Sequence, residues 1–400
     1  MDLPLAALNR GLFSIIGTLL SLIAIVYLGF GVVELGVLNA LNILAYIFVL
    51  QLADKLADAG RINLLWRIGG LSMILLHVLI YLSMALSSKT LIYVASVIYA
   101  VLIASAGLAI NTYIFESRSS WEWNAAFVET SRFRLLFEAL LLFAIAYASL
   151  RVVISSYIYY VALPATLVYM LSGLVIREPS LKIERIHYRL ESIMSKAMVS
   201  VDGILALSYM ELGGAVPIST RIYMAATVSS GLVFTALTGF RLGSEYLWVP
   251  LPFLLMNVLN LSIENVLLIY SAGRLVAFTF YTLIRKDVVF KKSFLTFSII
   301  LRVATVLALI RTSSVIVIGL FLGLIYLTSD VIGSNLFLIF AKSRGGYGLG
   351  LFNIVSEIVG LVGSITSGYV FASLGPSNTM SLIGALFLLA MPVALRYRSE

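Results

Sequence analysis

Four charged residues stand inside long apolar stretches in the second half of this sequence: Arg274, Arg302, Asp330 and Glu357. A charge at the depth of a hydrocarbon core is costly and is a functional candidate by default. Each lies about ten residues from one end of its stretch, so a rise of about 1.5 Å per residue brings all four near one depth. Two cations and two anions at one level predict ion pairs among these residues. Such pairs could serve a substrate or proton, or they could only hold the protein together.

Polar residues accompany two of these charges at helical spacing. Tyr326 lies one helical turn before Asp330, and Asn353 lies one turn before Glu357. Residues so spaced share a helix face, and a polar face inside a membrane is turned toward protein or water rather than lipid. Tyr326 and Asn353 therefore join the four charges as substrate or coupling candidates.

Two other pairs have the spacing of a local ion pair within one helix. Arg134 stands four residues before Glu138, and Arg241 stands four before Glu245. We expect both pairs near span ends, with Glu138 toward the inner end and Glu245 at the outer rim.

The composition requires a lipid environment. Hydrophobic residues make up 61% of the 400 positions and charged residues only 12%, with a mean hydropathy of +1.06, whereas a soluble domain carries about 25% charged residues. Cysteine is absent, and His77 and His187, the two histidines, stand far apart, so we expect no metal and no cofactor. No Gly-Lys pair is present, which excludes the usual phosphate-binding loop of an ATPase.

The apolar stretches predict an all-α membrane protein with twelve transmembrane helices. Each is long enough for a span, which needs about 20 apolar residues. The predicted spans are 11–33, 36–53, 64–86, 90–114, 133–150, 154–176, 222–244, 263–284, 293–311, 314–340, 347–372 and 377–395.

The basic residues orient these spans. With both termini cytoplasmic, most of the 27 Lys and Arg residues fall in inner loops, and the outer loops hold only Lys89, Arg151 and Arg311. This bias follows the positive-inside rule, and it explains the net charge of +8 without nucleic acid as a partner. We expect a multi-pass protein of the plasma membrane that acts as a monomer in the lipid bilayer.

The longest polar interval, 177–221, divides the chain into two six-helix bundles, 1–176 and 222–400. Apolar residues recur at helical spacing over 183–194, which predicts an amphipathic helix on the inner membrane surface within this cytoplasmic linker. A short thirteenth span over 197–216 is the alternative.

The loop after the second span resembles a loop of the major facilitator superfamily. That family has Gly-x-x-x-Asp-Arg-x-Gly-Arg, and this chain has Leu50 in place of the first Gly, then Asp54, Asp58 and Gly-Arg61. Extra residues leave open whether Asp54 or Asp58 is the equivalent acid. The resemblance implies that these acids and Arg61 latch the loop against a neighbouring helix and so influence gating.

A second resemblance lies at the start of the eleventh span. Arg344-Gly-Gly-Tyr-Gly-Leu-Gly-Leu-Phe-Asn353, followed by Gly360, Gly363, Gly368 and Leu-Gly375-Pro376, is similar to the small-residue packing face of that family. The two six-helix halves and the long middle loop agree with it.

The resemblance implies a secondary active transporter of a small organic solute that works by alternating access, with protons as one candidate coupling ion. It also implies that spans one, four, seven and ten line the cavity, which makes Asp330 the leading substrate or proton site, and that span nine is peripheral, which favours a structural role for Arg302. An enzymatic activity is not expected. The alternatives are a membrane-embedded lipid-modifying enzyme and a scramblase or channel.

Overall fold

The computed structural model describes residues 3–58, 60–117, 123–147, 157–175, 230–284, 288–289, 291–312, 314–343 and 349–396. All the regular structure in these residues is helical. The expected amphipathic helix at 183–194 and the alternative span at 197–216 lie outside the described residues, and so does the whole of 177–221.

The first half of the chain forms long helices that turn back at short connections. Their bounds are α1 (Leu3–Leu28), α2 (Val32–Asp58), α3 (Ile62–Ala85), α4 (Lys89–Ser117), α5 (Trp123–Tyr147), the π-helical turn η2 (Ile158–Ala162) and α7 (Leu163–Gly173).

The second half repeats this pattern of long antiparallel helices. Its elements are α10 (Ser230–Trp248), α11 (Leu251–Phe253), the π-helical turn η3 (Leu254–Val258), α12 (Ile263–Leu283), α13 (Lys292–Leu309), α14 (Val315–Ser343), α15 (Leu349–Leu388) and α16 (Met391–Arg396). In the described residues, eight helical segments are long and apolar enough to cross a membrane.

Helical residues occupy each predicted span, but several bounds differ. α5 begins at Trp123, ten residues before the predicted start at 133, because its first turns are polar and fall below the threshold for an apolar span. The eleventh predicted span and most of the twelfth lie in one helical element, α15, and the twelfth ends in α16. The chain reverses within α15 at Gly375, which has φ 74° and ψ 169° and is followed by Pro376. Only glycine adopts such a conformation without strain.

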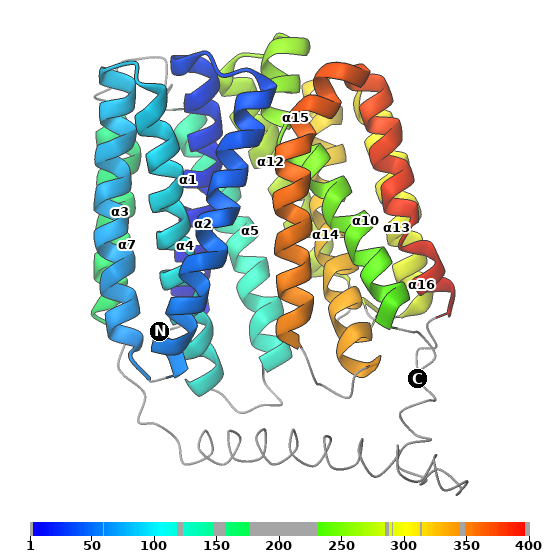
Figure 1. Cartoon of the computed structure of the whole chain (residues 1–400), viewed down its shortest axis with the longest axis horizontal. Helices are drawn as coiled ribbons and strands as arrows, with labels where there is room; N and C mark the ends of the chain where they lie inside the picture. The colour runs from blue at the N-terminus through cyan, green and yellow to red at the C-terminus, as the bar shows by residue number, and fades with distance from the viewer. Residues whose placement is uncertain are drawn as a thin grey trace, which may run out of the picture.

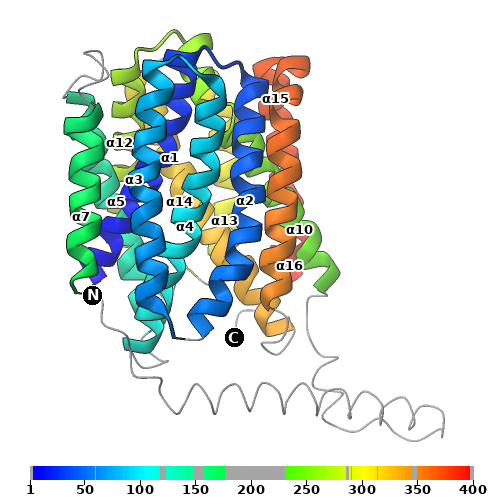
Figure 2. The same ribbon diagram turned by 60° about the vertical axis from the view of Figure 1, so that its left-hand side comes forward.

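The helices stand side by side in two groups. Figure 1 shows α1 to α7 on one side and α10 to α16 on the other, with α1 beginning and α16 ending at the same lower end. Figure 2, turned by 60°, shows α2 beside α15 where the two groups meet. The other extensive contact between the groups joins α5 to α12.

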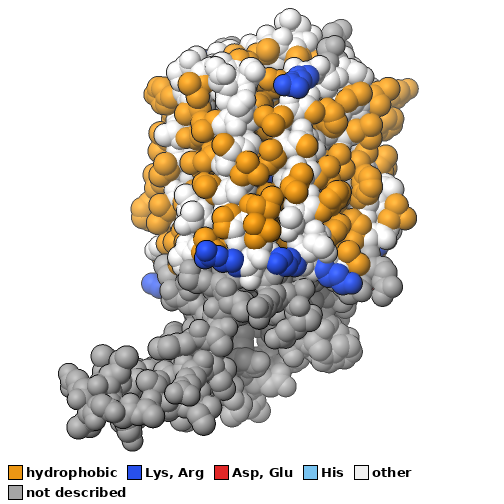
Figure 3. Space-filling model, turned by 90° about the vertical axis from the view of Figure 1, so that its right-hand side faces the viewer, with side chains coloured by type: hydrophobic (Ala, Val, Ile, Leu, Met, Phe, Trp, Pro, Cys, Tyr) orange, Lys and Arg blue, Asp and Glu red, His pale blue; other side chains and the backbone are white. Residues whose placement is uncertain are grey.

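The outer surface is apolar along the helix flanks. Leu71 is 70% exposed and Ile316 is 75% exposed, and Figure 3 shows hydrophobic side chains over the flank of the bundle. Most Lys and Arg side chains on that face form a band at the lower end. An apolar flank with a basic rim is the surface of a protein embedded in lipid.

Glycines let α2 and α15 pack backbone to backbone near their upper ends. A Cβ atom on Gly368 would lie 2.6 Å from the carbonyl oxygen of Val32 and 2.6 Å from the Cα of Val33. A Cβ on Gly36 would lie 2.6 Å from the carbonyl oxygen of Ser364. Small residues allow this close approach between membrane helices, so the two groups are tightly joined at this end.

Replacing Gly368 with Ala is expected to lower the free energy of unfolding by about 1–3 kcal/mol, because the new methyl group overpacks the α2–α15 contact. The measurement is thermal and chemical unfolding of the purified protein in detergent. Gly107→Ala is the matched control, since an added Cβ there meets no atom within 4 Å and alanine favours the helix. Equal stability of the two variants would contradict the packing described here.

Candidate functional site

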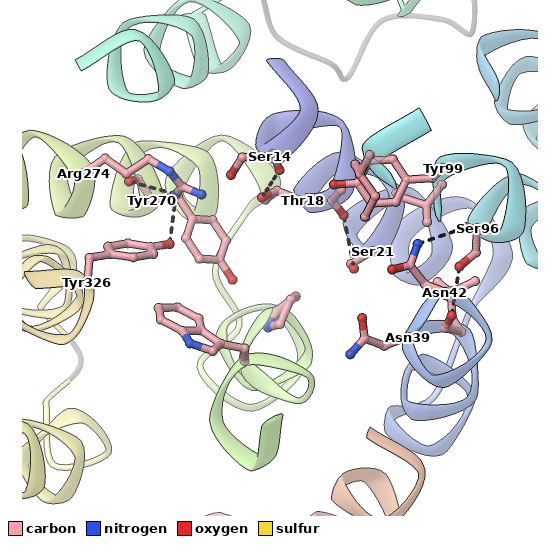
Figure 4. A pocket seen from close by; sticks show the side chains of 16 residues that line it. Ser14, Thr18, Ser21, Asn39, Asn42, Ser96, Tyr99, Tyr270, Arg274 and Tyr326 are labelled. Atoms are coloured by element: carbon pink, nitrogen blue, oxygen red, sulfur yellow. Dashed lines mark hydrogen bonds between the residues drawn. The ribbon is translucent and has the colours of Figure 1, made fainter. Parts of the chain in front are cut away.

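A central cavity of about 370 Å³ lies between the two groups of helices. Figure 4 shows its side chains converging from α1, α2 and α4 on one side and from α12 and α14 on the other. Its lining consists of Ser14, Gly17, Thr18, Leu20, Ser21, Leu38, Asn39, Asn42, Ser96, Tyr99, Ile103, Trp248, Pro252, Tyr270, Arg274 and Tyr326.

Small hydroxyl residues on one face of α1 form part of the wall. The Thr18 hydroxyl donates to the carbonyl oxygen of Ser14 at 3.1 Å, and the Ser21 hydroxyl donates to that of Gly17 at 3.5 Å. Because the helix backbone takes up these O–H donors, the oxygen lone pairs remain to accept hydrogen bonds from a bound solute.

Residues of α2 and α4 extend the same wall. The Asn42 side-chain amide donates to the carbonyl oxygen of Ser96 at 3.0 Å. The Tyr99 hydroxyl donates to the carbonyl oxygen of Phe13 at 2.8 Å and so joins α4 to α1. These bonds orient the side-chain oxygens of the wall without adding a charge to it.

The opposite wall is aromatic and carries one cation. Trp248 stacks on Tyr326 with ring centroids 4.9 Å apart. The Arg274 guanidinium donates to the Tyr326 hydroxyl at 2.9 Å and to the carbonyl oxygen of Tyr270 at 3.4 Å. Arg274 is thus fixed at the edge of an aromatic surface (Figure 4).

Arg274 belongs to a cluster of four charges that joins the two groups of helices, which we call the cross-bundle cluster. Its Nε donates to the buried carboxylate of Glu138 on α5. Arg134 lies 3.6 Å from the same carboxylate and 3.7 Å from Asp330 on α14. Two guanidinium groups and two carboxylates make the cluster neutral.

A second cavity of about 420 Å³ is lined in part by the same Asn39, Asn42, Ile103 and Trp248 and reaches toward the lower ends of α2 and α10. Three charged side chains line this lower cavity: Arg241 and Glu245 from α10, and Glu357 from α15. Its remaining lining residues are Ile43 and Tyr46.

The expected pairing among Arg274, Arg302, Asp330 and Glu357 is wrong. Arg274 pairs with Glu138, Asp330 with Arg134, and Glu357 with Arg241 at 3.6 Å. Charges at equal depth lie at one level of the bundle. Which of them pair depends on which helices are neighbours and on how each helix is rotated, and depth determines neither. The Arg134–Glu138 and Arg241–Glu245 pairs expected from their spacing are confirmed.

Glu138 and Glu245 lie at the site, but the sequence did not identify them as candidates, because they were expected near span ends. Glu138 is buried because α5 begins ten residues earlier than predicted. Glu245 is also buried, and it accepts hydrogen bonds from Asn39 and Ser364. The Arg-x-x-x-Glu spacing is the sequence signal that could have identified both. A buried carboxylate needs a counter-charge, and an arginine four residues earlier on the same helix supplies one.

Arg302 binds neutral groups. Its Nη1 donates to the carbonyl oxygen of Ile325 at 2.9 Å and to the Ser329 hydroxyl, and its Nη2 donates to Ser244 at 3.2 Å. The guanidinium lies 5.2 Å from the ring centre of Phe240 and 4.2 Å from that of Phe387. These contacts tie α13 to α10, α14 and α15.

The other candidates lie away from the cavities. Asn353 is exposed and is absent from the lining of both cavities described here. Asp54 and Arg61 are exposed near the lower ends of α2 and α3, and the side chain of Asp58 lies outside the described residues. The latch between these loop residues and a neighbouring helix stays a prediction.

Solved transporters have the same arrangement of helices. The chain aligns over 100% of its length with 96% of the xylose transporter XylE from E. coli, in a partially occluded inward-open conformation, at 13% identity and a TM-score of 0.64. A D-xylose–proton symporter aligns with 100% of this chain over 97% of its own, at 12% identity and a TM-score of 0.67. The chain has the major facilitator fold.

A third solved structure has a similar arrangement of helices. A bacterial homologue of the human lysosomal transporter Spinster, in an inward-facing and occupied conformation, aligns with 99% of the chain over 94% of its own, at 12% identity and a TM-score of 0.59. No protein-family model and no curated protein sequence matches this chain. The major facilitator fold is thus recognised here from the arrangement of helices rather than from sequence identity.

Replacing Glu138 with Gln is expected to lower the free energy of unfolding by about 3–5 kcal/mol, because it leaves the buried Arg274 guanidinium without its carboxylate. Thermal unfolding in detergent measures the effect. Adding Arg274→Gln to the variant should recover a large part of the loss, since no buried charge is then stranded.

Glu34→Gln is the control for the Glu138 substitution. Glu34 also pairs with a cation, Lys89 at 2.7 Å, but both side chains are partly exposed, so the loss should stay below about 1 kcal/mol. Equal losses for Glu34→Gln and Glu138→Gln would mean that burial does not strengthen the cross-bundle pair.

Proposed function

We propose that this protein is a secondary active transporter of a small polar solute, with two six-helix bundles, 1–176 and 222–400, that expose a central site to the two sides of the membrane in turn. The observation that carries the proposal is the polar central cavity between two groups of lipid-facing helices. A cavity lined by several polar groups inside an apolar bundle suits a polar solute. We infer twelve spans, six in each bundle, and the helical residues found within each predicted segment support this number.

The cavity chemistry supports a neutral, hydroxyl-bearing solute such as a sugar or polyol. Its hydroxyl and amide oxygens offer acceptors along α1, α2 and α4, and the Trp248–Tyr326 stack offers a flat apolar face. Arg274 is the one cation that the described residues place in this lining, and it pairs with Glu138. Two of the solved structures with this fold are xylose transporters, which agrees with a solute of this class.

The contacts between the halves support alternating access. α2 and α15 meet backbone to backbone at the upper end, whereas the lower cavity continues toward the lower ends of the helices. The cross-bundle cluster joins α5 to α12 and α14. We assign Asp330, with Arg134, to a gate that must separate when the halves move, and Asp54 or Asp58 with Arg61 to the latch on the loop after α2.

The basic rim supports a cytoplasmic lower end and a place in the plasma membrane. Most Lys and Arg side chains on the face in Figure 3 lie at that end, where α1 begins and α16 ends. By the positive-inside rule this end faces the cytoplasm. The lower cavity then lies on the cytoplasmic side of the central cavity.

The test is transport by the purified protein in liposomes. A thermal-shift screen against sugars and polyols first finds a solute that stabilises the folded protein, since binding to the native state alone raises its stability. Uptake of that labelled solute should saturate and should show counterflow exchange. Flux without saturation or exchange would instead indicate a channel or scramblase and would sink the transporter proposal.

Trp248→Ala should weaken binding of that solute by about 0.5–1.5 kcal/mol, or roughly 2- to 12-fold in the dissociation constant, because it removes the aromatic face of the cavity. Equilibrium binding to the purified variant measures the change, and its thermal unfolding reports whether it is folded. Leu71→Ala, on the lipid-facing surface, is the control. Unchanged binding by a folded Trp248→Ala protein would remove the aromatic wall from the solute site.

A further inference from the structure

A further cavity, of about 490 Å³, lies at the outer edge of the first bundle, between the start of α3 and the end of α7. Figure 1 shows these two helices together at one edge of the molecule. We propose that this cavity, which we call the edge groove, binds the headgroup of one anionic phospholipid from the cytoplasmic leaflet. The proposal uses the orientation of the lower end given above, and it does not depend on the identity or the transport of a solute.

The edge groove belongs to the lipid-facing surface. Leu71 of α3 is 70% exposed and Met170 of α7 is 43% exposed, and both line the groove. Exposed apolar side chains on the flank of a membrane protein contact acyl chains, so a molecule that fills the groove stands among lipids. The residues that α3 contributes share one helix face, because they recur three and four positions apart: Asn63, Trp66, Arg67, Gly70 and Leu71.

The edge groove carries a positive charge. Arg67 is its one cation among the described residues, and no described carboxylate lines it. Arg67 is exposed and stands near Ile62, where α3 begins at the lower end. A rise of about 1.5 Å per residue places its Cα within roughly 8 Å of that helix end, and a long arginine side chain reaches the headgroup level from there. An anionic headgroup is the complementary partner.

A second polar group at the edge groove lacks a partner. The indole of Trp66 is buried, and its Nε1–H donates to no acceptor among the described residues. Buried N–H groups in folded proteins nearly always have an acceptor, so an acceptor from outside the chain is expected here. The phosphate and ester oxygens of a phospholipid are such acceptors.

Gly173 keeps the space next to this N–H free of side-chain atoms. A Cβ atom on Gly173 would lie 2.7 Å from Nε1 of Trp66 and 3.0 Å from its Cδ1. Gly173 itself lines the edge groove from the last turn of α7. An oxygen atom that enters the groove beside Gly173 is therefore next to the unpaired indole N–H.

The aromatic floor of the edge groove is held in place by the protein alone. Trp66 and Tyr169 stack with ring centroids 4.2 Å apart and planes 4° from parallel. The Tyr169 hydroxyl donates to the carbonyl oxygen of Trp66 at 2.8 Å. The site is thus formed before a lipid binds, which lowers the entropic cost of binding. A headgroup that contacts both Arg67 and the indole lies against α3 and α7 at once.

The test is native mass spectrometry of the purified full-length protein, titrated in detergent with phosphatidylglycerol or phosphatidylcholine that carry identical acyl chains. The first phosphatidylglycerol should bind the wild type about fivefold more tightly than the first phosphatidylcholine, the effect of one arginine near an anionic headgroup. Arg67→Gln should bring the two affinities together. Lys55→Gln, which removes an exposed cation outside the groove at the same end, should keep the wild-type ratio.

Trp66→Phe tests the second contact. Phenylalanine keeps a ring to stack on Tyr169 but has no N–H donor, so both phospholipids should bind roughly 2- to 12-fold more weakly, since both offer phosphate oxygens. The ratio between the two affinities should stay as in the wild type, because Arg67 is intact. Thermal unfolding without added lipid establishes that each variant is folded. Unchanged affinities in folded Trp66→Phe would remove the indole from the site.

Three results would overturn the lipid site. One is equal affinity of the wild type for the two phospholipids. Another is a preference that survives in folded Arg67→Gln, or that Lys55→Gln loses equally, which would indicate a general attraction to the basic rim. The third is stabilisation of the wild type by inorganic phosphate at the concentration at which phosphatidylglycerol acts, which would indicate a site for a free anion. Because none of these measurements needs a transported solute, the lipid site and the transporter proposal fail separately.

Discussion

The contact between Arg274 and Glu138 is the interaction on which the site depends. A guanidinium at this depth in an apolar bundle needs a counter-charge, and the nearest one comes from the other bundle. This fixes α12 against α5, orients Arg274 toward Tyr326, and places the stacked Trp248 at the cavity wall. It also keeps the central cavity near neutral, which sets the kind of solute that the cavity suits.

The same requirement divides the ionisable groups into two sets with different chemistry. In the cross-bundle cluster each carboxylate has a guanidinium partner, and these pairs join the two halves. In the lower cavity Arg241 meets two acids and the balance fails by one charge.

Much of the fold could be predicted from the sequence, because apolar length alone selects helices in lipid. Arg274, Asp330 and Glu357 were correctly placed on helices in the interior of the chain's apolar stretches. Their partners could not be predicted, since a partner depends on which helices are neighbours and how each is rotated. Glu138 shows the difficulty: the polar start of α5 made a buried acid look like one at a span end.

The polar residues that line the central cavity were still harder to predict from the sequence. Ser14, Thr18 and Asn42 are ordinary residues for membrane helices, and nothing in their local sequence marks them. They become a site only when α1, α2 and α4 are brought around one space. Residues that bind through many weak neutral contacts leave little trace in a single sequence, whereas a lone charge in an apolar run is conspicuous.

Arg302 fixes the helices of the second half to one another. From α13 its guanidinium contacts Ser244 and Phe240 on α10. It also contacts Ile325 and Ser329 on α14, and Phe387 in the part of α15 that follows the Gly375 reversal. Through this one side chain α13 is fixed to three other helices of its half. In the proposed transport cycle this half therefore moves as one body, and the movement takes place at the two contacts between the halves, α2 with α15 and α5 with α12.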